Sequence, residues 1–141
     1  MKIEEIERII KIKKPLLFID KVVELEKGNK TTCIKLFTYN ENFFQGHFEG
    51  NPIVPGTILI ECMLQSLKLA YFSQYDFDEE VFLLFYIPIV TFKKRVIPGD
   101  ELKSEVMITL LKNELMGEVR SFVEGINVCS LTIKLNKKWK I

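Results

Sequence analysis

Several features are scarce in this sequence, and each scarcity excludes a class of protein. The 141 residues contain one histidine, so the usual multi-histidine metal sites cannot be built. The three cysteines, Cys33, Cys62 and Cys129, form no Cys-x-x-Cys pair, and we expect them to be reduced thiols in a cytosolic protein. With 20 basic and 19 acidic side chains the net charge is +1, whereas a nucleic-acid-binding protein usually has a clear basic excess.

Long hydrophobic runs are also missing. The most apolar run, residues 57–72, contains Glu61, Gln65 and Lys68, and it is too short and too polar to span a membrane. Residues 1–12 carry too many charges for a signal peptide, and we therefore expect a cytoplasmic location. The isoleucines of this first segment fall on one helical face, which predicts a short amphipathic helix.

The bulk properties predict a single domain over residues 1–141. Hydrophobic residues make up 48% and charged residues 28% of the chain, a balance typical of globular proteins. A chain of this length buries roughly two-thirds of its unfolded surface, so it needs neither a metal nor a disulfide to form a core. No repeat, low-complexity tract or linker rich in proline and glycine divides it.

Hydrophobic periodicity predicts two strands, one long helix and then four more strands. The predicted strands cover residues 16–25, 31–39, 81–96, 102–110, 118–124 and 127–135, and the predicted helix covers residues 57–73. A single long helix must cover one face of an antiparallel sheet, since no other element can. We therefore expect an α+β fold in which the sheet wraps around one central helix.

The most informative segment, residues 46–56, contains His47, the only histidine of the chain. Glycines and prolines surround it and restrict the backbone path, which is how a loop holds a side chain in place. An imidazole can accept and release a proton near neutral pH, so His47 is a candidate for proton transfer. A lone histidine next to Phe44 and Phe48 is, however, more often a structural residue than a catalyst.

The predicted long helix carries one narrow polar stripe, formed by Thr57, Glu61, Gln65 and Lys68. The stripe faces either water or an enclosed pocket. In a pocket of low dielectric a carboxyl group is held in its protonated form, so Glu61 could act as a general acid. Gly56 would then lie at the helix start, where free N–H groups and the positive end of the helix dipole can polarise a carbonyl oxygen.

A family resemblance rests on the spacing of these residues. The motif reads His47-Phe48-x-Gly50-x-Pro52-x-x-Pro55-Gly56 and continues with Glu61, Met63 and Gln65. It resembles the signature of the FabZ-type 3-hydroxyacyl-[acyl-carrier-protein] dehydratases of bacterial fatty-acid synthesis. The segments 15–20, 43–46 and 92–100 resemble the same family.

The resemblance implies a hotdog fold and a dehydration reaction. It also implies a homodimer, or a trimer of dimers, in which His47 of one chain faces Glu61 of the other. His47 would take the α-proton of the thioester, and the Gly56 N–H would stabilise charge on the thioester oxygen. Glu61 would protonate the departing hydroxyl group as water, with Gln65 orienting Glu61 from one helical turn away.

The resemblance implies a substrate and a partner but no metal or organic cofactor. The acyl chain would lie in an apolar tunnel, for which Phe48, Val54 and Tyr86 are the candidate lining residues. An acidic acyl carrier protein would deliver it on a phosphopantetheine arm. The basic run from Lys93 to Arg95 is then either a docking surface for this partner or a solvated strand end.

Departures from the family pattern leave two other functions open. Tyr86 stands where the family has a small residue, and Pro88 cannot donate a hydrogen bond to a neighbouring strand, so we expect this strand to differ in shape. One alternative function is a hotdog thioesterase that hydrolyses the thioester with an acidic residue of the same helix. The other is a non-catalytic paralogue that binds an acyl chain or a carrier protein.

Overall fold

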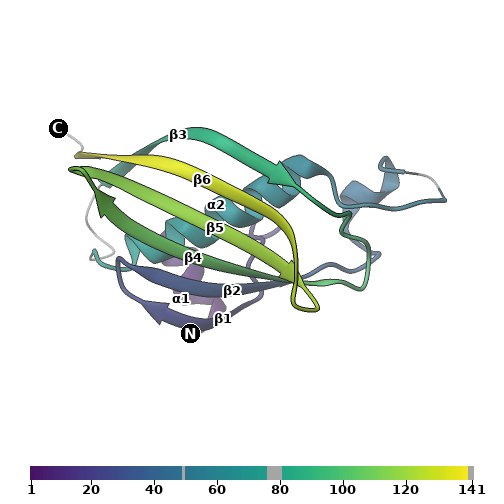
Figure 1. The fold of residues 1–141 in the computed structure, drawn as a ribbon. Helices are drawn as coiled ribbons and strands as arrows, with labels where there is room; N and C mark the ends of the chain where they lie inside the picture. Colours follow the sequence, from purple (N-terminus) through teal and green to yellow (C-terminus); the bar gives the residue numbers. More distant parts are fainter. Residues whose placement is uncertain (49, 76–80, 140–141) are drawn as a thin grey trace.

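One antiparallel sheet and one long helix dominate the computed structural model, which describes residues 1–48, 50–75 and 81–139. The elements are α1 (Ile3–Ile10), β1 (Lys21–Glu26), β2 (Lys30–Leu36), the 3-10 helix η1 (Asn42–Gln45), α2 (Gly56–Phe72), β3 (Val81–Phe92), β4 (Glu101–Leu111), β5 (Glu114–Val123) and β6 (Ile126–Trp139). The strands pair in the order β1-β2-β4-β5-β6-β3 (Figure 1). The predicted α+β fold, a sheet around a central helix, is confirmed.

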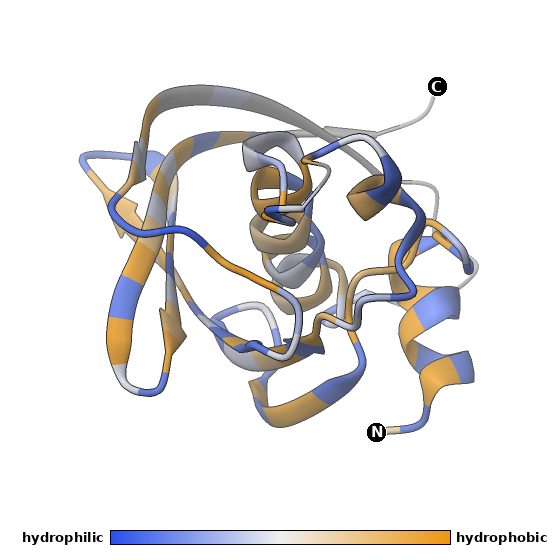
Figure 2. Cartoon of the chain, turned by 90° about the vertical axis from the view of Figure 1, so that its right-hand side faces the viewer, coloured by the Kyte–Doolittle hydropathy of each residue, from blue (hydrophilic) through white to orange (hydrophobic). Residues whose placement is uncertain are grey.

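Helix α2 lies inside the curved sheet, and Figure 2 shows it almost end-on with the strands around it. The helix has apolar residues around most of its circumference, as expected of a helix that is buried on several sides. The side chains of Met63, Leu67 and Ala70 are fully buried. Helix α1 packs against the other side of α2 through Ile6, which contacts the cluster that includes Leu69.

The inner face of the sheet follows the alternation that the sequence shows. In β4 every second residue from Leu102 to Ile108 is buried and the residues between them are exposed. The register places Thr31, Val106, Val119 and Leu131 side by side across four strands, and all four are buried. These side chains belong to the inner face of the sheet, against which α2 packs.

Several element boundaries differ from the predictions. Strand β1 begins at Lys21 rather than at residue 16, because the backbone of residues 16–18 bonds to a side chain of α2 instead of to a strand. Strand β3 ends at Phe92 rather than at residue 96. The pairing of β3 with β6 changes register between Tyr86 and Ile89, the interval that contains Pro88, whose missing N–H removes a ladder hydrogen bond.

Candidate functional site

His47 lies in the loop between η1 and α2, and several contacts hold its ring. Its Nδ1 lies 3.2 Å from the backbone oxygen of Ile53, and the Ile53 N–H donates to the His47 oxygen at 3.0 Å. The ring stacks on Phe48 with 4.1 Å between the centroids. Because a carbonyl oxygen only accepts, Nδ1 carries the proton in this contact, and Nε2 of a neutral ring is left as the basic nitrogen.

Gly56 is the first residue of α2. The preceding Pro55 makes no side-chain cap, and within the described residues no group accepts a hydrogen bond from the Gly56 N–H. A Cβ added at this position would lie 3.1 Å from Cζ of Phe92. The glycine therefore lets an aromatic ring pack closely over the helix start, where an unpaired N–H and the helix dipole favour a negatively charged oxygen.

A groove of about 330 Å³ joins the His47 loop to the helix start. Its lining residues are His47, Ile53, Val54, Gly56, Leu59, Phe92, Lys93, Lys94, Arg95 and Val96. The wall is apolar and the three basic side chains are exposed. Sequence reasoning did not single out Phe92 as a site residue, although its position at the end of an apolar strand directly before a basic run was visible in the sequence.

Gln65, further along α2, is fully buried, and both its amide oxygen and its amide nitrogen form hydrogen bonds. Its Oε1 accepts the Phe18 N–H at 2.7 Å, and its Nε2 donates to the Leu16 oxygen at 2.8 Å. The same Nε2 donates to Oε1 of Glu61 at 3.1 Å. The interpretation of the polar stripe as a water-facing surface is therefore wrong for Gln65, which is covered by residues 16–18.

Glu61 does not line the groove that contains His47. It follows Gly56 by five positions, which corresponds to a rotation of about 140° around the helix axis relative to position 56. Glu61 is half-buried, with the Gln65 amide beside it. Within one chain, the groove therefore contains the imidazole but not the carboxyl group.

The three candidate tunnel residues lie in different surroundings. Val54 is buried and lines the groove, and its N–H donates to the Val96 oxygen at 2.8 Å. Phe48 is half-exposed and covers the His47 ring. Tyr86 is 69% exposed on β3 and does not line the groove. The structure thus brings only one of the three, Val54, into the wall beside His47 and Gly56.

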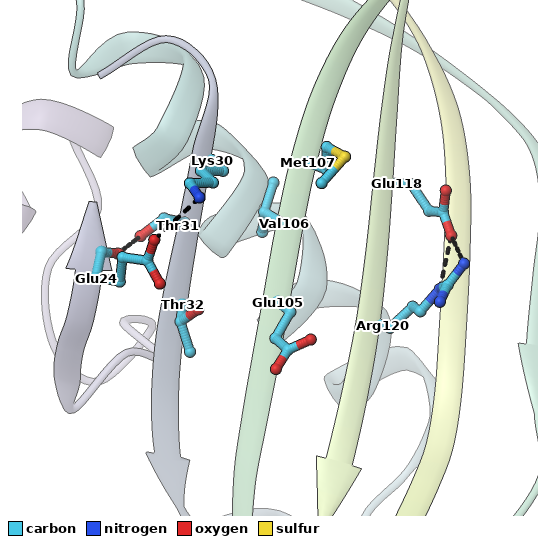
Figure 3. Close-up of a pocket in the computed structure, with 9 residues that line it drawn as sticks. All are labelled: Glu24, Lys30, Thr31, Thr32, Glu105, Val106, Met107, Glu118 and Arg120. Atoms are coloured by element: carbon cyan, nitrogen blue, oxygen red, sulfur yellow. Dashed lines mark hydrogen bonds and ion pairs between the residues drawn. The ribbon is translucent and has the colours of Figure 1, made fainter. Parts of the chain in front are cut away.

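A second hollow, of about 360 Å³, lies on the sheet and shares no residue with the groove. Figure 3 shows two ion pairs in this hollow, Lys30 with Glu24 and Arg120 with Glu118, while the Glu105 side chain stands apart from them. Lys30 Nζ lies 3.3 Å from Glu24 Oε1, and Arg120 bonds Glu118 at 2.7 Å. Because these cations already have carboxylate partners, this hollow offers no evident group for an acyl thioester.

The cysteines are free and buried, in agreement with the expected reduced thiols. Burial raises the pKa of all three thiols, that of Cys129 to about 11, so none has the character of a catalytic thiolate. Among the residues that the structure describes, no cluster of three metal-binding side chains occurs. No helix in the described ranges is long and apolar enough to cross a membrane.

The sequence is similar to that of a known protein family. A model of the FabA-like domain matches residues 11–131. The chain is 40% identical over 116 residues to the 3-hydroxyacyl-[acyl-carrier-protein] dehydratase FabZ of Caldicellulosiruptor saccharolyticus, covering 82% of this chain and 83% of the relative. It is 38% identical over 124 residues to the protein of the same name from Clostridium botulinum, covering 87% and 86%.

Solved structures with low identity share the fold. The dehydratase heterocomplex ApeI:P from Xenorhabdus doucetiae superposes with a TM-score of 0.59 at 18% identity, over 82% of this chain and 96% of that chain. A hypothetical thioesterase protein with coenzyme A from Streptococcus pneumoniae gives 0.60 at 12% identity, over 85% and 88%. The sheet wrapped around α2 is therefore a hotdog fold. Within that class, the chain belongs to the FabA-like family and is of the FabZ type.

Proposed function

We propose that this chain removes water from a 3-hydroxyacyl thioester on acyl carrier protein and yields the trans-2-enoyl thioester. The observation that carries the proposal is that His47, with Nε2 as its basic nitrogen, and the Gly56 N–H, which has no acceptor among the described residues, line the same groove. A base and an oxyanion donor are what removal of an α-proton from a thioester requires. The names of the FabZ relatives state this dehydratase activity for those proteins.

In the proposed reaction His47 acts as the base at Cα, and Glu61 acts as the acid at the hydroxyl group on Cβ. Nε2 of His47 takes the proton from Cα, and the Gly56 N–H stabilises negative charge on the thioester oxygen. The electron pair then forms the Cα=Cβ bond while the Cβ–O bond breaks. Protonated Glu61 supplies the proton with which the hydroxyl group leaves as water. No metal or organic cofactor takes part in any of these steps.

We infer that the same reaction uses two chains, because Glu61 of the same chain does not line the groove that contains His47. We propose a homodimer, or a trimer of dimers, in which Glu61 of one chain approaches His47 of the other. The edge strand β3 supports this assembly because it exposes Tyr86, Ile89 and Phe92. An apolar sheet edge of this kind is normally covered in the native assembly.

The groove also suits a carrier-bound acyl group. Val54, Leu59 and Phe92 supply apolar contact for the acyl chain, whereas Lys93, Lys94 and Arg95 are exposed at the same groove. We propose that these three cations contact the acidic carrier protein. Complementary charge at the edge of a site speeds encounter and orients the partner.

One assay tests the proposal against its alternatives. The purified protein is incubated with a 3-hydroxyacyl thioester of acyl carrier protein while enoyl absorbance and free thiol are followed together. Enoyl formation without thiol release is the expected result. Thiol release without enoyl product would instead indicate a thioesterase, and neither signal would indicate a binding paralogue.

A further inference from the structure

Lys35, in β2, is a cation buried in the interior of the protein. Its side chain points to the same side as Cys33 and Phe37, and only 8% of the residue is exposed. A buried ammonium group is unfavourable unless carboxylates surround it. Two do so here, since Nζ lies 2.7 Å from Glu41 Oε1 and 3.5 Å from Asp20 Oδ2.

The first carboxylate, Glu41, begins the segment that carries His47. Glu41 directly precedes η1, and its backbone oxygen accepts the Phe44 N–H at 3.2 Å. Phe44 is buried, and its ring centroid lies 4.7 Å from that of Phe43. The loop with His47 starts immediately after this 3-10 turn, so the ion pair of Lys35 with Glu41 fixes where the loop departs from the sheet.

The second carboxylate, Asp20, is at the end of residues 16–20, a segment that is hydrogen-bonded to Gln65 and, through Gln65, to Glu61. Asp20 Oδ2 also accepts the Leu36 N–H at 2.7 Å, which ties it to the end of β2. Two residues earlier, the Phe18 N–H donates to Gln65, and Gln65 donates to Glu61. A path of short contacts therefore runs from Lys35 to the Glu61 carboxyl group.

The buried thiol of Cys62 reports the same arrangement. Burial raises its pKa most strongly, the positive charge of Lys35 lowers that pKa, and the carboxylates of Glu61 and Asp20 raise it. Cys62 is the neighbour of Glu61 on α2. The Lys35 charge is thus felt at the helical turn that carries Glu61.

We infer that Lys35 is a positioning residue that sets both the His47 loop and the Glu61 turn without touching the substrate. The inference rests on the proposed function for the roles of His47 and Glu61. The contacts through Glu41 lead to His47 (the His47 arm), and those through Asp20 lead to Glu61 (the Glu61 arm). In the proposed dimer His47 and Glu61 of one chain belong to different active sites, so each Lys35 supports both sites. Displacing a reacting group by about 1 Å can lower a rate by about 10²-fold.

The test uses the single histidine as a probe. In the substrate-free protein the imidazole C–H signals of a proton NMR spectrum come from His47 alone. We expect Lys35→Met and Glu41→Gln to shift or broaden these signals. Asp20→Asn acts on the other arm and is expected to leave them in place. Lys134→Met is the matched control, since Lys134 Nζ bonds Glu114 at 2.6 Å on the sheet surface.

His47 signals in folded Lys35→Met that superimpose on those of the unaltered chain would overturn the inference. If Lys35→Met does not fold, Glu41→Gln decides in the same way, because it leaves Lys35 paired with Asp20. These spectra need no substrate, so they hold whether or not the chain forms an enoyl product. A chain without dehydratase activity would reject the proposed function and leave the positional result standing.

Kinetics separate positioning from simple structural support. We expect Lys35→Met to lower kcat about tenfold or more with KM little changed, since the groups displaced act in the chemical step. Lys35→Arg keeps the charge and is expected to recover most of the kcat. Asp20→Asn should lower kcat through the Glu61 arm alone. An unchanged kcat in Lys35→Met beside normal activity of the unaltered chain would also reject the inference.

Discussion

The amide of Gln65 donates a 3.1 Å hydrogen bond to the Glu61 carboxyl group from one turn further along α2. The same amide bonds the backbone of Leu16 and Phe18, so one buried side chain joins the helix to the segment before β1. This junction explains both why residues 16–18 do not form a strand and how Glu61 is held.

Gln65→Leu is expected to lower the free energy of unfolding by about 1–3 kcal/mol, because it removes the side-chain partner of the Phe18 N–H and of the Leu16 carbonyl in two part-buried hydrogen bonds. The kcat should fall as well, since Glu61 loses its neighbour. Urea unfolding and the enoyl assay measure the two effects. Gln74→Leu is the control, because Gln74 is exposed and its side chain donates to the Tyr71 oxygen of the neighbouring turn at 2.8 Å. Equal losses in both variants would contradict the role given to Gln65.

His47→Ala and Glu61→Gln should each lower kcat by about 10²–10⁴-fold, the usual contribution of a positioned acid or base. Neither substitution removes a contact on which the core depends, so the melting temperature should change little. Calorimetry beside the enoyl assay checks both statements. Activity that survives in either variant would reject the proposed acid–base pair.

Mixing those two inactive variants tests whether the site lies between chains. A dimer of one His47→Ala chain and one Glu61→Gln chain contains one site with both groups intact and one with neither. After unfolding and refolding together, random pairing should restore about a quarter of the activity of the unaltered protein, as expected for an isologous dimer. A mixture as inactive as its components would show that each chain supplies both groups to its own site.

The parts of the fold that follow from local periodicity could be predicted from the sequence. The alternation from Leu102 to Ile108 predicts a strand and the apolar run of residues 57–73 predicts a long helix, and the structure has both elements. The site could be predicted only as a set of residue types. Nothing in the spacing shows that Gln65 bonds residues 16–18 or that Lys35 has two carboxylates, because these contacts join segments far apart in the chain. The proposed meeting of His47 with Glu61 of a second chain is likewise beyond what the pattern of one chain encodes.

Gly117 gives a prediction about packing that leaves the chemistry aside. A Cβ at this position would lie 2.8 Å from Leu67 Cδ1 and 2.9 Å from Ile133 Cγ2, so the glycine allows α2 to approach β5. Gly117→Ala should destabilise the fold by about 1–3 kcal/mol through overcrowding. Adding Leu67→Ala should cost less in this background than in the unaltered chain, as a double-mutant cycle of urea midpoints would show. Strict additivity would mean that the two positions do not compete for space.

Substitutions in the basic run beside the groove distinguish a docking surface from a solvated strand end. Replacing Lys93, Lys94 and Arg95 together by alanine should raise KM for the carrier-bound substrate and leave kcat almost unchanged, because in the proposal these exposed cations contact the carrier rather than the reacting atoms. The same substrate on a short, uncharged thioester should show no such change. Added salt should weaken the carrier-bound reaction of the unaltered chain and have a smaller effect on the triple variant, since screening removes what the substitutions already removed. If the triple variant uses both substrates as the unaltered chain does, these side chains are solvated strand ends, and the carrier protein docks elsewhere.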